Sequence, residues 1–175
     1  SADLISGGTA DLNIWQHICS VFVPTPGTAI VYKNGVQTNS TTGQTAMADN
    51  VRSATIGNRW DNLRQFTGQI DDVRIYNRAL SATEIATLYR SGSKIENVGQ
   101  NNRLTNGLVG LWSFNGYDYN SASTTAEVLD RSGNNYNGDN IGATPTAGKV
   151  GQGLSFNGST NYVSAGSIYN TISSN

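Results

Sequence analysis

Short apolar stretches alternate with clusters of Gly, Asn, Ser and Thr along the whole chain. The 175 residues include 20 glycines, and no apolar stretch is long enough to cross a bilayer. Short runs of apolar and β-branched residues bounded by turn formers are typical of strands. This alternation predicts an all-β protein with many tight connections, and the length fits a single core.

The apolar stretches predict where the strands lie. We expect strands within Ile14–Val23, within Thr28–Ser40 on both sides of Asn34-Gly35, at Ala54–Asn58 and at Phe66–Asn77. Asn-Gly favours a two-residue hairpin, because the type I′ turn needs positive φ at both positions. The later strand candidates are Leu108–Phe114, Gly138–Ile141, Gly153–Phe156 and Tyr162–Ala165.

One segment predicts a helix, at Ser81–Arg90. Ser81 and Glu84 have the spacing of a capping box, in which each side chain satisfies a backbone amide of the other residue. Leu80, Ile85 and Leu88 supply an apolar stripe, and Gly92 is a candidate left-handed stop. A helix of about three turns is marginal alone, so we expect it to pack on a sheet.

Charge and cysteine content exclude several kinds of protein. Charged residues make up 13% of the chain and the formal net charge is −1, which argues against binding to nucleic acid or to an anionic membrane. Cys19 is the only cysteine, so it forms no internal disulfide and no multi-cysteine metal site. Within its apolar stretch it is expected to be a buried small side chain.

Several motifs together resemble one family. Phe66–Tyr89 reads FTGQIDDVRIYNRALSATEIATLY, and the chain also contains GLVGLWSFNG, DRSGNNYNG and GKVGQGLSFNGSTNYV. With WQHI, VYKNGV and ATIGN, these motifs resemble the laminin-G-like, concanavalin-A-like jelly-roll domains of bacterial surface and secreted proteins. The resemblance implies a concanavalin-A-like jelly-roll sandwich with one short helix.

The motifs stand in permuted order. Residues 1–92 resemble the later half of such a domain, 93–106 read as a polar linker, and 107–175 resemble the earlier half. A central block of strands is missing, which favours a fragment across two tandem repeats over a circular permutant. In the family the first and last strands are neighbours, so the two halves could pair within one chain. Because open sheet edges would remain, we also expect a homodimer formed by strand or half-domain complementation.

The resemblance implies an extracellular or cell-surface module that binds a glycan or another cell-surface ligand. Aromatic residues in polar loops are the candidate ligand-binding residues, since an exposed ring can stack on a sugar. The candidate ligand-binding residues are the aromatic residues Trp60, Tyr117 and Tyr119, together with Asn62 in the same loop as Trp60. The alternative function is that of a purely structural spacer.

The third possible function is that of a hydrolase, and the sequence favours the other two functions over it. His17 is the only histidine and could act as a general base on a phosphodiester, such as RNA, or on a glycoside. Lys33, Arg74 and Tyr76 could then hold an anion. No GxSxG, HExxH or P-loop motif is present, and a histidine in the WQHI strand of the family is structural.

Three carboxylates are candidate calcium ligands. Asp71 and Asp72 lie in the expected Phe66–Asn77 strand and Asp130 opens DRSGNNYNG; relatives often hold a structural calcium. The alternative is that Asp71 caps local backbone and Asp130 forms an Asx-turn before Ser132. No DxDxDG spacing is present.

Overall fold

The computed structural model describes residues 11–45, 53–59, 61, 63–91 and 104–168. Within these residues the chain forms eleven short strands and one helix, and every strand pair is antiparallel. The predicted all-β class with one short helix is therefore confirmed. The chain divides into two compact units. Unit 1 consists of Ser1–Ala48 and Arg78–Leu104, and unit 2 consists of Asp49–Asn77 and Thr105–Asn175.

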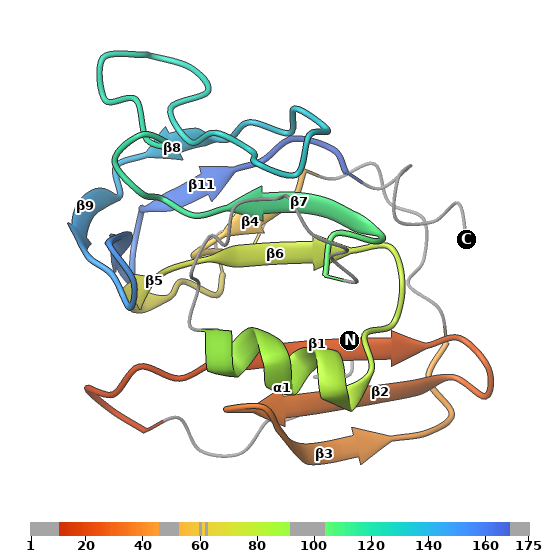
Figure 1. Ribbon diagram of the computed structural model, residues 1–175. Helices are drawn as coiled ribbons and strands as arrows, with labels where there is room; N and C mark the ends of the chain where they lie inside the picture. The colour runs from red at the N-terminus through yellow and green to blue at the C-terminus, as the bar shows by residue number, and fades with distance from the viewer. Residues whose placement is uncertain (1–10, 46–52, 60, 62, 92–103, 169–175) are drawn as a thin grey trace. The chain divides into compact units, whose positions relative to one another are not determined.

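Unit 1 contains a three-stranded sheet in the order β1-β2-β3 (Figure 1). Its strands are β1 (Ile18–Val23), β2 (Thr28–Lys33) and β3 (Val36–Thr41). Asn34 and Gly35 connect β2 to β3 with φ values of 53° and 78°. The two positive φ values confirm the predicted Asn-Gly hairpin.

The helix of unit 1, α1 (Ala82–Ser91), begins at the predicted capping box. The backbone N–H of Glu84 donates to Ser81 Oγ at 3.3 Å, and the backbone N–H of Ser81 donates to Glu84 Oε2 at 2.8 Å. Arg78 donates hydrogen bonds to the Glu84 carboxylate, and these are the main reason that the pKa of Glu84 is lowered to about 2. Ile85 is fully buried, so the expected apolar stripe faces inward, while Gly92 lies outside the described residues.

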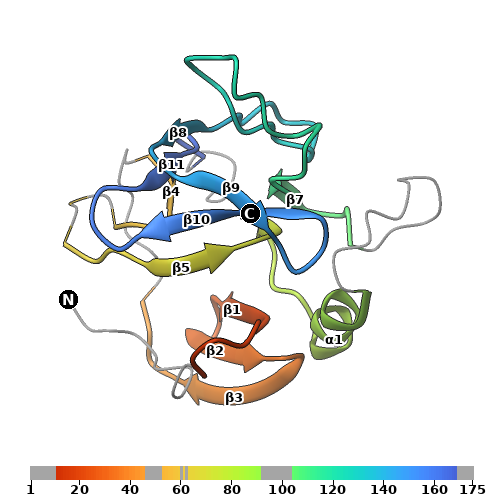
Figure 2. The ribbon, with the colours of Figure 1, turned by 90° about the vertical axis from the view of Figure 1, so that its left-hand side faces the viewer.

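Unit 2 is built from three small sheets. Their strand orders are β5-β10-β9, β4-β11-β8 and β6-β7, and Figure 2 shows β10 between β5 and β9. The strands are β4 (Thr55–Ile56), β5 (Thr67–Ile70), β6 (Val73–Tyr76), β7 (Leu108–Trp112), β8 (Asp139–Ile141), β9 (Thr144–Ala147), β10 (Gln152–Asn157) and β11 (Tyr162–Ser164).

Strands from both sides of the expected linker pair within unit 2. Val73 of β6 lies opposite Trp112 of β7. β5 pairs with β10, and β4 pairs with β11. The segment before the linker and the segment after it thus share one set of sheets in a single chain.

The expected continuous strand Phe66–Asn77 is wrong in one respect, because it is broken between β5 and β6. Asp72 adopts a φ of 53°, which interrupts the period-two alternation of a strand. Its carboxylate accepts hydrogen bonds from Arg74 Nε and Nη2, each at 3.0 Å. This local ion pair accompanies a break in the strand that the apolar pattern did not reveal.

Strand β9, which contains Pro145, was not among the strands predicted from the sequence. Proline lacks a backbone N–H and is tolerated at sheet edges. β9 is the edge strand of its sheet, with Pro145 opposite Leu154 of β10.

The core of unit 2 centres on Trp112, which is fully buried. Its Nε1 donates to the carbonyl oxygen of Tyr136 at 2.8 Å, so the buried indole N–H is satisfied. A Cβ atom on Gly110 would lie 2.2 Å from the indole ring, and only glycine leaves room for it. The other buried members of this core are Ile56, Phe114, Val128, Ala143, Leu154, Phe156, Val163 and Ala165.

Candidate functional site

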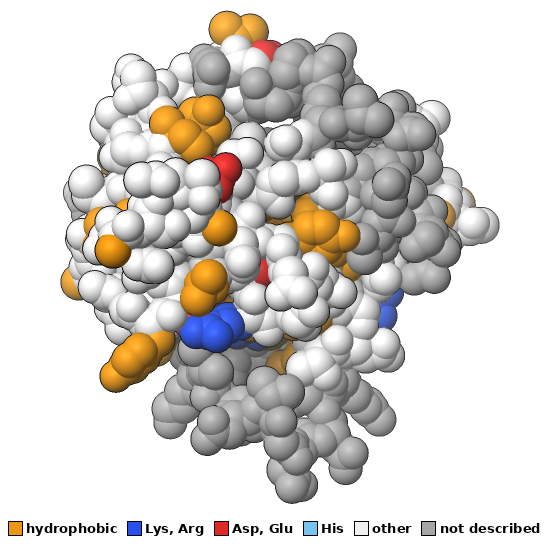
Figure 3. All heavy atoms as spheres, turned by 90° about the horizontal axis from the view of Figure 1, so that it is seen from above, with side chains coloured by type: hydrophobic (Ala, Val, Ile, Leu, Met, Phe, Trp, Pro, Cys, Tyr) orange, Lys and Arg blue, Asp and Glu red, His pale blue; other side chains and the backbone are white. Residues whose placement is uncertain are grey.

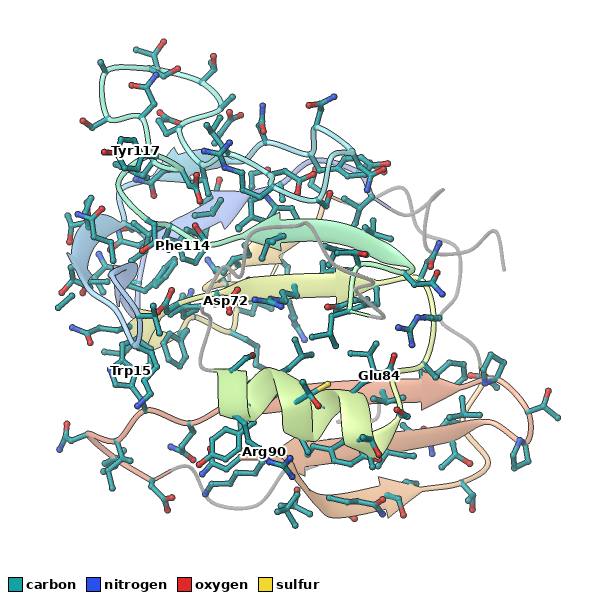
Figure 4. All side chains as sticks on the ribbon, in the orientation of Figure 1. Trp15, Asp72, Glu84, Arg90, Phe114 and Tyr117 are labelled. Carbon is teal, nitrogen blue, oxygen red and sulfur yellow. The ribbon has the colours of Figure 1, made fainter. Side chains whose placement is uncertain are left out.

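Tyr117 lies on the loop that follows β7, where Figure 4 labels it beyond Phe114. Its side chain is 95% exposed, the highest value among the exposed large hydrophobic residues of the described chain. An aromatic ring that stays in water over its whole surface adds nothing to the stability of the fold. The ring therefore offers a flat apolar face to a ligand.

The backbone beneath Tyr117 is fixed by an ion pair between the buried Asp118 and the exposed Arg131. Asp118 is 4% exposed and accepts hydrogen bonds from Ser113 Oγ and, at 2.5 Å, from Arg131 Nε. Arg131 Nη2 also donates to the carbonyl oxygen of Tyr117 at 3.2 Å. The ring is thus presented by a loop that is held in place before any ligand arrives.

Asp118 and Arg131 were not among the residues predicted from the sequence. Asp118 lies between Tyr117 and Tyr119, two predicted ligand-binding residues, and this position was only a weak indication that Asp118 belongs to the site. Arg131 lies thirteen positions along the chain from Asp118, and no spacing rule links them. Only the folded loop brings the two side chains together.

Tyr119, the second predicted aromatic of this loop, lies against the core of unit 2. Its hydroxyl accepts a hydrogen bond from Asn140 Nδ2 at 2.7 Å. Asn140 Nδ2 also donates to the carbonyl oxygen of Ala143 at 2.8 Å, which ties the ring to the β8 region. Tyr119 consequently shapes the loop and exposes less of its ring than Tyr117 does.

Trp60 and Asn62, also predicted as ligand-binding residues, lie outside the described residues. Their neighbour Asp61 is described, and its carboxylate is held by Arg59 Nε at 2.7 Å. That hydrogen bond from Arg59 is the main cause of the lowered pKa of Asp61. Asn58 and Gln65 form an isolated antiparallel β-bridge.

The four candidate catalytic residues are divided between the units. His17 and Lys33 belong to unit 1, and Arg74 and Tyr76 belong to unit 2. The His17 ring lies 6.1 Å from the Tyr89 ring between centroids, and Lys33 Nζ lies 3.0 Å from Asp11 Oδ2. These contacts engage both side chains with neighbours in their own unit.

Asp130, a predicted calcium ligand, is 8% exposed and directs its carboxylate at protein donors. Oδ1 accepts from the backbone N–H groups of Leu111 at 2.9 Å and Ser132 at 2.8 Å. Oδ2 accepts from Ser132 Oγ at 2.8 Å and from the N–H of Tyr136 at 3.0 Å. The bond to Ser132 N–H is the Asx-turn that the sequence offered as an alternative.

Asp71 and Asp72 have different surroundings. Asp72 is paired with Arg74, as described above, whereas Asp71 Oδ2 accepts from the N–H of Val150 at 2.9 Å. Asp71 Oδ1 is buried and has no hydrogen-bond partner, and burial is the main cause of the raised pKa of this carboxyl. The sequence alternative of a local cap is thus replaced by a cap 79 residues away.

The three carboxylates do not form a shared cation site in the described part of the chain. There, no group of three or more His, Cys, Asp or Glu side chains is arranged to hold a metal ion. Asp72 and Asp130 already face cationic or N–H and O–H donors, which does not fit a calcium ligand. One buried oxygen of Asp71 is the single carboxylate atom of the three without a partner.

Acidic and basic side chains are sparse among the described residues on the face shown in Figure 3. There, apolar side chains are scattered among backbone atoms and uncharged polar side chains. In the described residues, no helix is long and apolar enough to span a membrane.

Comparison with known proteins gives one match. Residues 1–86 match the family model described as the concanavalin A-like lectin/glucanases superfamily. No curated protein and no solved structure matches the chain significantly. The match covers unit 1 strands and the β4–β6 segment of unit 2, and it supports a carbohydrate-binding or related module.

Proposed function

We propose that the chain, whose residues 1–86 match the model of the concanavalin A-like lectin/glucanases superfamily, is a carbohydrate-binding module. The observation that carries the proposal is the fully exposed ring of Tyr117 on a loop pinned by Asp118 and Arg131. The C–H face of a sugar ring is apolar and packs on such an aromatic face.

The ligand class follows from the charges around the ring. Asp118 and Arg131 neutralise each other beneath it, and the chain has a formal net charge of −1. Neither a phosphate nor a sulfate group would find an unpaired cation in this pair. A neutral oligosaccharide is therefore the ligand that this surface fits best.

Replacing Tyr117 by alanine is expected to weaken oligosaccharide binding by roughly tenfold, the factor that about 1.4 kcal/mol produces. The melting temperature should stay unchanged, because the ring contributes almost nothing to the core. Isothermal titration of the protein with neutral gluco-, galacto- and manno-oligosaccharides measures the affinity.

Tyr117→Phe is the matched control, since it keeps the ring and removes only the hydroxyl. It should retain most of the affinity. Equal affinity of the wild type and Tyr117→Ala would remove this loop as the site. Absence of binding to every oligosaccharide tested would favour the structural spacer instead.

Two further proposals accompany the binding function. An extracellular or cell-surface location with a role in adhesion suits a glycan-binding module, because its ligands lie outside the cell. A homodimer is proposed because a sandwich without its central strands leaves strand edges open. Labelling of intact cells tests the location, and light scattering tests the dimer.

Calcium remains a proposal with a small expected effect. With Asp71 Oδ1 as the one carboxylate atom of the three without a partner, excess Ca²⁺ should raise the melting temperature by no more than about 2–4 °C. Differential scanning calorimetry with calcium and with chelator measures the shift. A much larger rise would contradict this small effect and point to a fuller set of oxygen ligands.

A further inference from the structure

Strand β1 is the outermost strand of the unit 1 sheet on one side. It pairs with β2, and no other described strand pairs with it. Its sequence, ICSVFV, is uncharged and apolar except for Ser20, and Pro24 follows only after its end. An apolar, uncharged edge strand without proline is the kind of edge that pairs with another chain.

The backbone contacts of His17 show which groups of β1 face the open edge. The N–H of His17 donates to Asn34 Oδ1 at 2.9 Å, and its carbonyl accepts from the N–H of Asn34 at 2.8 Å. Both backbone groups of His17 therefore face the β2 side. Because this direction alternates along a strand, the N–H and C=O groups of Ile18, Ser20 and Phe22 point to the open edge.

These three residues fix the register that a partner strand would take. In an antiparallel pair, directly opposite residues either both face the shared edge or both face away from it. A second β1 uses all three outward residues only when Ser20 lies opposite Ser20 of the second copy. Ile18 then lies opposite Phe22 of that copy.

The side chains suit this self-pairing. Ile18 is 57% exposed and would gain an apolar neighbour in Phe22, while Cys19 would lie opposite Val21 on the other face. The absence of charge in β1 means that two copies meet without like-charge repulsion. The opposite edge of the same sheet, β3, is dominated by exposed Gln, Thr, Asn and Ser and would bury little apolar surface.

We propose that two copies of the chain associate through β1, antiparallel about a two-fold axis at Ser20. The arrangement rests on the homodimer proposed above and specifies its interface. A two-fold pairing of edges closes after two copies, so neither β1 edge remains open. Two three-stranded sheets become one six-stranded sheet across the interface.

Cross-linking at the axis tests the proposal directly. In the Cys19→Ser background, Ser20→Cys introduces one thiol that would lie opposite its own copy. Facing Cα atoms in a hydrogen-bonded antiparallel pair are about 5.5 Å apart, within the range that a disulfide spans. Mild oxidation followed by a non-reducing gel should show rapid conversion to a covalent dimer.

Gln37→Cys in the same background is the matched control, because Gln37 is exposed on β3, the other edge strand of this sheet. The paired thiols should cross-link roughly a hundredfold faster than this control at micromolar protein, since pairing raises their effective concentration to the millimolar range. Circular dichroism of both variants checks that each keeps its fold.

A second pair of variants tests the interface without covalent capture. Ser20 is exposed, and Ser20→Lys places two like charges at the axis. Light scattering should then show a monomer at concentrations where Gln37→Lys remains a dimer.

The outcomes separate this proposal from those on which it rests. A dimer in which Ser20→Cys and Gln37→Cys cross-link equally slowly would overturn the β1 interface and leave the dimer itself standing. A wild-type monomer by light scattering would overturn both. Glycan affinity at Tyr117 is read in a different assay, so its loss or retention bears on the binding function alone.

Discussion

Replacing Trp112 by alanine is expected to lower the free energy of unfolding of unit 2 by about 3–5 kcal/mol. The indole is fully buried in the core and packs over Gly110. Truncation leaves a cavity in a core that cannot fully collapse, and it removes the hydrogen bond from the indole to the carbonyl oxygen of Tyr136. Natural domains have only about 5–15 kcal/mol of stability in total, so this loss is a large fraction of it.

Urea denaturation followed by far-ultraviolet circular dichroism measures this loss without relying on tryptophan fluorescence. Trp112→Phe should cost less, because the phenyl ring fills part of the cavity. Tyr117→Ala removes a large aromatic side chain from a 95% exposed position and should cost almost nothing. Equal losses for Trp112→Ala and Tyr117→Ala would mean that Trp112 is not at the centre of the core.

Local signals in the sequence predicted local structure well. The Asn34-Gly35 turn and the Ser81–Glu84 capping box each depend on residues next to one another or three apart, and both are present. The apolar stretches also located most strands to within a few residues. The motif resemblance extended this to the pairing of β6 with β7 across the linker.

The features that the sequence did not predict depend on residues brought together by the fold. Asp72 interrupts the strand where the apolar pattern continues, and its ion-pair partner is Arg74, a residue type that also occurs within strands. Asp118 lies on the loop after β7, and its partner Arg131 lies thirteen residues further along the chain. Asp71 caps the backbone at Val150, which lies in another part of the sequence. Side-chain contacts over such separations leave no periodic signal.

The sequence identified the candidate ligand-binding residues by their chemical type, and the structure distinguishes them by the exposure of their side chains. Tyr117 and Tyr119 look equivalent in the sequence, two aromatic residues in one polar loop. The difference arises because Tyr119 has Asn140 within hydrogen-bond distance and the core beside it, whereas Tyr117 has neither. Burial of alternate residues in a loop is decided by the sheet beneath it.

Replacing Asp130 by alanine is expected to destabilise unit 2 by about 3–5 kcal/mol. Its carboxylate satisfies three backbone N–H groups and one hydroxyl, and it ties β7 to the 130–136 loop through Leu111 and Tyr136. Alanine leaves these donors without acceptors in a site where Asp130 is only 8% exposed. Each buried donor left unsatisfied costs about 1–3 kcal/mol, reduced where water can enter.

Urea denaturation of matched variants tests this role. Asp130→Asn keeps one acceptor oxygen and should lose roughly half as much stability as Asp130→Ala. Asp139→Ala is the control, because Asp139 is exposed and accepts one hydrogen bond, from the N–H of Ala126, so its loss should be about 1 kcal/mol or less.

The same variants decide between a hydrogen-bonding and a metal-binding role for Asp130. If its stabilisation comes from the four protein donors, the Asp130→Ala loss is the same in calcium and in chelator. If a calcium ion were held there, chelator would destabilise the wild type and leave the variant unchanged, so the difference between them would shrink. Because every oxygen lone pair that faces the protein already meets an N–H or O–H group, we expect the loss to be independent of calcium.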